Sequence, residues 1–204
     1  MHWLGQVDDQ TTHEVHRVVS AVVGLGGAVG WLQTPTLTDI GAWLAGWQAA
    51  MATGRAGLAL CRVDGQIQAV GGWQAGRAGA TGHVAELTKV MVHPDIRGLG
   101  LGRLVVDTLI TGADSFGAEV LTLGVRGNNH GAMALYEACG FTTWGVIPNG
   151  VAVGQHRFDD VRMSRQLRLP ANAVIHGSSA GGVGGSPDRS IGELLGLGSR
   201  PDPC

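Results

Sequence analysis

The sequence Val90-Met91-Val92-His93-Pro94-Asp95-Ile96-Arg97-Gly98-Leu99-Gly100-Leu101-Gly102-Arg103 runs directly into a helical pattern over residues 104–116. β-favouring residues end a strand before Pro94, and glycines stand at 98, 100 and 102, where the helix must begin. Glycine lets successive backbone N–H groups converge, and a helix N-terminus adds the positive end of its dipole. The stretch therefore predicts an anion-binding loop, with a phosphate as its ligand.

The glycine spacing excludes two common phosphate loops. A P-loop has four residues between its glycines and ends in Gly-Lys-Ser/Thr, but the single lysine of this chain, Lys89, precedes the loop. A dinucleotide-binding fingerprint needs its third glycine at 103 or 105, where the chain has Arg103 and Val105. The loop must therefore bind a different phosphate ligand.

The remaining pattern resembles the GCN5-related N-acetyltransferase (GNAT) superfamily, whose signature after a strand is Arg/Gln-x-x-Gly-x-Gly/Ala. Arg97, Gly100 and Gly102 supply that signature here. A second block, residues 128–141, matches the later family motif Asn-x-x-Ala-x-x-Leu-Tyr-x-x-x-Gly-Phe position for position. The resemblance covers roughly residues 55–167. Residues 146–150 and 157–167 look similar to members that acetylate small molecules, including antibiotic- and toxin-resistance enzymes.

Strand and helix patterns alternate along the chain after an N-terminal pair of helices. We expect an α/β (α+β mixed) GNAT-like fold: a mixed, mostly antiparallel sheet with helices on both faces. The expected helices are capped by Thr11 or Thr12 and by Thr38 or Asp39. The expected strands cover residues 1–7, 58–63, 67–74, 83–92, 119–126, 141–147 and 157–167, and further helices cover 104–116 and 129–139. The strand over 119–126 is expected to be buried on both faces.

The amino-acid composition limits the structural class of the chain and the kinds of partner it can bind. The 204 residues are 44% apolar and 15% charged with a net charge of −2, which predicts one globular domain over 1–169 and excludes a generally basic, nucleic-acid-binding surface. The Gly/Ser/Pro-rich composition of residues 170–204 predicts a flexible tail. The alternative is that the segment around Leu194-Leu195 docks on a neighbouring molecule. Residues 18–32 are too short and glycine-rich for a membrane span. An odd cysteine count favours a reducing cytoplasm. A homodimer is left open.

The resemblance implies acetyl-CoA as co-substrate. Backbone groups of Met91 and Val92, which follow Val90 on the strand, would pair with the pantetheine arm. Asn129 would hydrogen-bond the same arm, and Arg97 or Arg103 would attract phosphate. The pyrophosphate would be held by the N–H groups of Gly98, Leu99, Gly100, Leu101, Gly102 and Arg103. No histidine has metal-ligand spacing, so no metal is expected.

Acyl transfer to an amine needs a proton donor for the departing thiolate and a proton acceptor for the amine. Tyr136, the only tyrosine, falls on the family position of the acid; the alternative is a tyrosine that packs against the sheet. Glu86 is the candidate base, because some members carry a glutamate in this strand. By the two-residue period it shares a face with Val90 and Val92, and the alternative is a solvated strand-end glutamate.

These features predict direct transfer of acetyl from acetyl-CoA to a primary amine of a small molecule or peptide, in a ternary complex. Gly124 replaces a glutamate found in ribosomal-protein acetyltransferases, which disfavours a ribosomal substrate. A protein N-alpha or lysine acetyltransferase and a non-catalytic acyl-CoA sensor remain alternatives. Trp31, Trp43 and Trp47 are expected either in the core or on the acceptor side, and His83 or His130 is a candidate proton relay.

Overall fold

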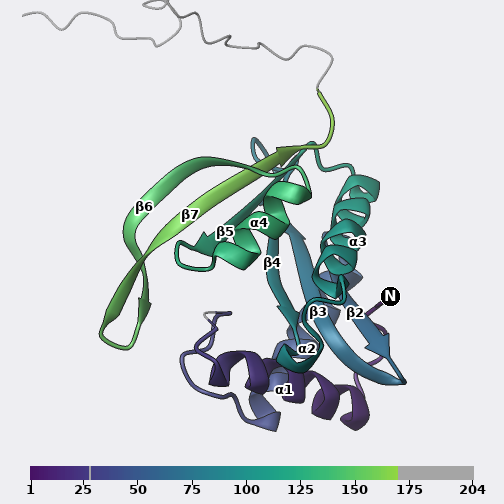
Figure 1. The fold of residues 1–204 in the computed structure, drawn as a ribbon. Helices are drawn as coiled ribbons and strands as arrows, with labels where there is room; N and C mark the ends of the chain where they lie inside the picture. Colours follow the sequence, from purple (N-terminus) through teal and green to yellow (C-terminus); the bar gives the residue numbers. More distant parts are fainter. Residues whose placement is uncertain (28, 170–204) are drawn as a thin grey trace, which may run out of the picture. The chain divides into compact units, whose positions relative to one another are not determined.

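The computed structural model describes residues 1–27 and 29–169. The expected tail at 170–204, including Leu194-Leu195, lies outside the described residues. The described strands form one seven-stranded sheet of order β1-β2-β3-β4-β5-β7-β6, in which only β4 and β5 are parallel (Figure 1). The strands are β1 (His2–Trp3), β2 (Ala56–Val63), β3 (Gln66–Ala75), β4 (Val84–Val92), β5 (Val120–Arg126), β6 (Thr142–Val153) and β7 (His156–Gln166). The expected mixed, mostly antiparallel sheet is confirmed.

Helices cover both faces of this sheet, as expected. The first face packs against α1 (Asp9–Gly24) and α2 (Leu37–Ala52), whose buried residues join those of β2 and β3 in one core cluster. The second face packs against α3 (Leu101–Phe116) and α4 (His130–Ala138), with a core cluster of its own. A short 3-10 helix, η1 (Pro94–Ile96), leads from β4 into the glycine loop. None of the described helices is both long and apolar enough to cross a membrane.

The two N-terminal helices begin earlier than the sequence predicted. Asp8 caps α1 by accepting from the backbone N–H of Thr11 at 2.7 Å. Thr36 caps α2 in a reciprocal capping box with Asp39. The predicted caps were wrong because those side chains lie inside the first turn, where an upstream acceptor already satisfies their backbone donors.

Strand β6 extends six residues beyond its predicted end at residue 147. Pro148-Asn149-Gly150 has the composition of a turn, but the structure accommodates it as an irregularity in the pairing with β7, between Ile147 and Val151. A proline is tolerated there because β6 is the edge strand, so no second neighbouring strand needs the backbone N–H that proline lacks. The predicted hairpin between β2 and β3 is confirmed, with Asp64 and Gly65 at positive φ.

The sheet opens between its two parallel strands. Strands β4 and β5 pair only where Val84–Glu86 meets Val120–Thr122. Beyond Glu86, β4 continues against β3 alone, and beyond Thr122, β5 continues against β7 alone. The two halves of the sheet therefore separate, and the second half of β4 has a free edge on that side.

A bulge in β4 changes which side chains share a face. Lys89 and Val90 together stand opposite Gly71 of β3, and Lys89 has a φ of 59°. The extra residue shifts the alternation, so that Val90 and Val92 pack with Leu87 on the α3/α4 face. Glu86 precedes Leu87 and therefore lies on the opposite, α1/α2 face. The prediction that Glu86 shares a face with Val90 and Val92 was wrong for this reason.

Strand β5 is buried mainly on one face. Leu121, Leu123 and Val125 are buried in the α3/α4 core, whereas Gly124 is exposed and Arg126 is half-buried on the other face. The prediction of burial on both faces was wrong because the opening beside β5 leaves its α1/α2 face to a cavity instead of a helix.

Candidate active site

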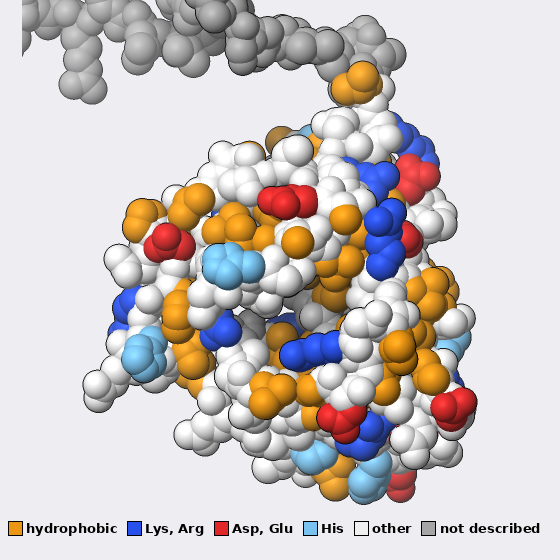
Figure 2. All heavy atoms as spheres, viewed as in Figure 1, with side chains coloured by type: hydrophobic (Ala, Val, Ile, Leu, Met, Phe, Trp, Pro, Cys, Tyr) orange, Lys and Arg blue, Asp and Glu red, His pale blue; other side chains and the backbone are white. Residues whose placement is uncertain are grey.

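A cavity of about 970 Å³ lies where β4 and β5 separate. It is lined by β4, the glycine loop, β5, α4, β7 and the loop between α1 and α2, and so it reaches both faces of the sheet. In Figure 2 the molecular surface is hollowed near the middle of the view, and Lys and Arg side chains surround the hollow. One end of the cavity is a backbone loop, and the other end is lined by charged side chains.

The glycine loop forms the first end. Gly98 and Gly100 have φ of 85° and 77°, which a side chain would strain, and Gly100 starts α3 with no side-chain cap among the described residues. The first N–H groups of α3 therefore lack acceptors within the helix. Gly98, Gly100 and Gly102 line the cavity, whereas Leu99 is 69% exposed and does not. This arrangement can bind an anion.

The two candidate arginines have different surroundings. Arg103 donates to the Asp107 carboxylate at 3.0 Å and to the Ala138 carbonyl at 3.0 Å, so it connects α3 to the end of α4. Both arginines line the cavity, but Arg97 has no ion pair among the described residues. Arg97 is therefore the better placed of the two to attract a phosphate.

The free edge of β4 leads from the glycine loop into the middle of the cavity. Val90 and Val92 pack on the α3/α4 core, and Met91 is buried on the other face, so the strand is held from both sides. Its backbone groups on the β5 side have no strand partner there. An extended, amide-containing ligand can pair with such an edge as an added strand does.

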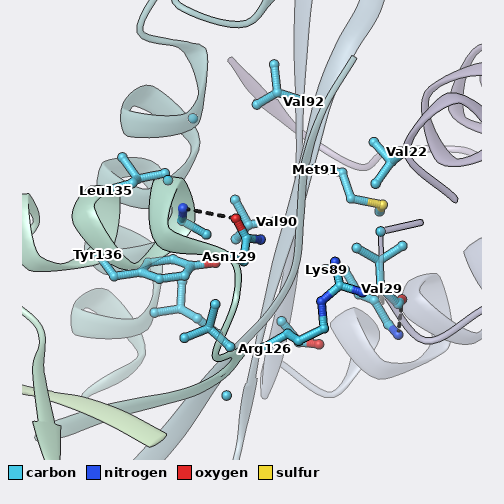
Figure 3. Close-up of a pocket in the computed structure, with 18 of the residues that line it drawn as sticks. Val22, Val29, Lys89, Val90, Met91, Val92, Arg126, Asn129, Leu135 and Tyr136 are labelled. Carbon is cyan, nitrogen blue, oxygen red and sulfur yellow. Dashed lines mark hydrogen bonds between the residues drawn. The ribbon is translucent and has the colours of Figure 1, made fainter. Parts of the chain in front are cut away.

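Tyr136 on α4 and Asn129, which precedes that helix, both line the cavity, and Figure 3 shows the tyrosine ring there. The ring packs edge-on against Phe141 at a centroid distance of 5.9 Å, and burial raises the pKa of the hydroxyl to about 12. The Asn129 side chain accepts from the Ala132 N–H at 3.2 Å and so caps α4 (Figure 3). Its amide N–H₂ group stays available for a ligand.

Glu86 lies in the charged end of the cavity. Its side chain is 57% exposed and lies 3.9 Å from Arg162 of β7, which also pairs with Asp160 at 2.6 Å. Arg162 stands directly across from Gly124 on β5. A Cβ at position 124 would lie 3.0 Å from Asp160 Oδ1 and 3.4 Å from Arg162 Cζ. The glycine thus leaves room for Arg162 to reach across β5 toward Glu86.

Two further cations in the cavity hold the loop between α1 and α2. Lys89 Nζ donates to the Val29 carbonyl at 2.7 Å and lies over the Trp31 ring at 5.1 Å. Arg126 Nη1 donates to the Gly26 carbonyl at 2.9 Å, and its guanidinium lies over the Phe158 ring at 4.8 Å. Burial lowers the pKa of Lys89.

Sequence reasoning missed four of these cavity residues. Alternation in β7 could have placed Asp160 and Arg162 on one face, but only the strand order brings them to Glu86. Lys89 and Arg126 carried no motif signal. Conversely, Trp43 and Trp47 pack in the α1/α2 core, Trp31 packs against Trp43, and neither His83 nor His130 lines the cavity.

Comparisons with known proteins agree with this geometry. The Acetyltransferase (GNAT) family profile matches residues 30–141. A [ribosomal protein bS18]-alanine N-acetyltransferase of Salmonella typhimurium is 35% identical over 85 residues, which span 42% of this chain and 57% of the relative. An L-methionine sulfoximine/L-methionine sulfone acetyltransferase of the same organism is 36% identical over 86 residues, or 42% of this chain and 48% of the relative. The chain thus matches only about half of each relative's length.

Solved structures share the fold over most of the chain. YncA of Salmonella typhimurium, solved with its cofactor acetyl-CoA, has a TM-score of 0.70 at 22% identity and covers 85% of this chain and 98% of its own. The ribosomal-protein-alanine N-acetyltransferase of Brucella melitensis has a TM-score of 0.69 at 21% identity and covers 80% and 98%. The family profile spans more than half of the sequence, including both motifs. This chain is a member of the GNAT family of acetyltransferases.

Proposed function

We propose that the chain is an acetyl-CoA-dependent N-acetyltransferase, with residues 1–169 as its catalytic domain and a small-molecule primary amine as its acceptor. The observation that carries the proposal is the separation of β4 and β5. The resulting cavity joins an anion-binding loop on the α3/α4 side to a charged chamber on the α1/α2 side. An acyl donor and an acceptor can therefore meet across the free edge of β4.

The residues present fit coenzyme A. The N–H groups of the glycine loop and Arg97 would bind its diphosphate, the β4 edge at Met91 and Val92 would pair with its amide-containing arm, and the Asn129 amide would donate to that arm. Bound acetyl-CoA supplies an activated acetyl thioester. The acetyl-CoA complex of the structural relative YncA is consistent with this assignment.

Tyr136 and Glu86 are the proposed proton donor and acceptor. An amine with a pKa near ~10.4 is neutral in only about one in ~10³ molecules at pH 7, so Glu86 accepts a proton from the acceptor ammonium, directly or through water. The amine nitrogen then forms the bond to the acetyl carbon as the bond to sulfur breaks, and Tyr136 protonates the departing sulfur. The second proton that the nitrogen loses, as the amide forms, restores the Tyr136 hydroxyl through water. A positioned acid or base contributes roughly 10²- to 10⁴-fold to such a step.

A protein N-terminus is the second candidate acceptor. The resemblance to an alanine N-acetyltransferase acting on a ribosomal protein favours it. Gly124 weighs against it, because the space of the glutamate in such enzymes is bordered here by Asp160 and Arg162. The relative that is named for L-methionine sulfoximine and L-methionine sulfone favours a small-molecule acceptor.

Release of thiol from acetyl-CoA, measured against a panel of free amines and alanine-terminated peptides, tests the proposal. We expect turnover with at least one free amine, and a roughly 10²- to 10⁴-fold lower kcat in Tyr136→Phe with unchanged acetyl-CoA affinity. Trp144→Phe, an exposed aromatic outside the cavity, is the control. Binding of acetyl-CoA without turnover on any acceptor would instead identify a sensor, and turnover confined to peptides would identify a protein acetyltransferase.

A further inference from the structure

The charged end of the cavity contains more cations than carboxylates. Lys89, Arg126 and Arg162 line it together with Glu86 and Asp160. The carboxylate of Asp160 pairs closely with Arg162, and Glu86 adds a looser contact to the same guanidinium. No carboxylate of residues 1–27 or 29–169 forms an ion pair with Lys89 or Arg126 within 4.0 Å. The two remaining cations therefore face the cavity without an anionic partner from these segments.

Lys89 and Arg126 contact the same short loop but keep unused donors. Each donates to one loop carbonyl, of Val29 and of Gly26, although an ammonium has three N–H donors and a guanidinium five. Arg126 Nε is buried and has no acceptor among the described residues. Figure 3 shows both side chains extending from opposite sides of the sheet opening toward Val29. Burying part of a cation costs free energy when its N–H donors lack acceptors, and a ligand anion that accepts from those donors would remove this cost.

Their position relative to Glu86 indicates which ligand supplies that anion. Glu86 and Lys89 lie three residues apart on β4, and Arg126 stands across the opening on β5. The glycine loop, which fits the phosphates of coenzyme A, lies beyond the C-terminal end of β4. An anion between Lys89 and Arg126 is therefore on the acceptor side, next to the proposed base.

We infer that the acceptor carries a carboxylate next to its reactive amine, and that Lys89 and Arg126 bind this carboxylate while the amine faces Glu86. This inference rests on the proposed acetyltransferase function and narrows its substrate class to free α-amino acids and their close analogues. A protein N-terminus lacks a carboxylate at that distance, because its α-carboxyl group is part of a peptide bond. The subsite thus distinguishes free amino acids from peptides.

The test compares free α-amino acids with their α-carboxamides, which keep the side chain but lose the negative charge. Because the amide also lowers the pKa of the α-amino group, kcat/KM is compared per neutral amine. We expect the native protein to show a kcat/KM roughly 10- to 100-fold higher for the acids, the value of a charge-assisted hydrogen bond. In Lys89→Met and in Arg126→Met this preference should shrink to less than about 3-fold, with the KM for acetyl-CoA unchanged. Arg157→Met is the matched control, because Arg157 also donates only to backbone carbonyls but lies outside the cavity.

Three results would overturn the inference. Equal kcat/KM for acids and carboxamides in the native protein would show that no subsite recognises the carboxylate. An equal slowing of both acceptor types in the variants would show that Lys89 and Arg126 only hold the loop. A raised KM for acetyl-CoA would assign the cations to the cofactor. If no amine is acetylated, the proposed function fails, but calorimetric binding of the same acids and carboxamides to the coenzyme A complex still tests the subsite.

Discussion

The environment of Tyr136 keeps its phenol protonated. Burial, with a smaller contribution from Cys139, raises the pKa of the hydroxyl from 10.0 to about 12. The neutral form, which a proton donor needs, therefore dominates at every pH below the ordinary tyrosine range. A thiolate that departs beside the ring would meet the same desolvation, which raises its proton affinity and offsets part of the difference in pKa between the phenol and the thiol.

Glu86 is the residue whose proposed role depends on its carboxylate. Glu86→Gln keeps the size of the side chain but removes the proposed proton acceptor. We expect this variant to lower kcat/KM for the acceptor roughly 10²-fold at pH 7 without changing acetyl-CoA affinity. Steady-state kinetics with each substrate varied measures both effects. Glu137→Gln, an exposed glutamate next to Tyr136 on α4, should retain the native rates; native rates in Glu86→Gln as well would show that another group is the base.

At the scale of single elements, β5 shows how the absence of a side chain at Gly124 shapes the charged end of the cavity. Because Gly124 stands across from Arg162, a methyl group there would press on both Arg162 and Asp160. We expect Gly124→Ala to lower kcat/KM for the acceptor about 10-fold, as a weakened charge-assisted contact would, without changing acetyl-CoA affinity. Steady-state kinetics with each substrate varied measures the two effects separately.

The control for this variant is Gly145→Ala on β6. That glycine is also in a strand, and an added Cβ there would meet no atom within 4 Å. Native kinetics are expected for Gly145→Ala. Native kinetics for Gly124→Ala as well would show that the Asp160–Arg162 pair has no part in acceptor binding.

The elements differ in how far the sequence alone determines them. The hairpin at Asp64-Gly65 and the loop at Gly98–Gly102 were predictable, because positive φ and helix initiation are local properties. The bulge at Lys89 was not, since it exists only relative to Gly71 on the neighbouring strand. It reversed the face assigned to Glu86, and this is the kind of error that a two-residue period cannot detect.

On the scale of the whole molecule, the site depends on the order of the strands. The glycine loop, the β4 edge and Tyr136 belong to two motifs that are visible in the sequence. The charged end of the cavity instead combines Lys89, Arg126, Asp160 and Arg162, which approach one another only because β7 inserts between β5 and β6 and β4 separates from β5. The sequence therefore predicted the family and drew attention to the glycine loop, and only the assembled sheet revealed the charged residues at the other end of the cavity.

The central claim is that the glycine loop and the opened sheet bind acetyl-CoA, and calorimetric titration of acetyl-CoA tests it directly. Two variants separate charge from backbone strain: Gly100→Glu brings a carboxylate to the proposed phosphate site, whereas Gly100→Ala adds the strain alone. Gly46→Glu, on an exposed position of α2 with no atom within 4 Å of an added Cβ, controls for the added charge.

We predict one saturable site in the native protein and in Gly46→Glu. The affinity of Gly100→Glu should be at least ~100-fold lower, because like charges placed together cost several kcal/mol, and Gly100→Ala should lie between. Absence of heat with the native protein, or undiminished affinity in Gly100→Glu, would contradict the account.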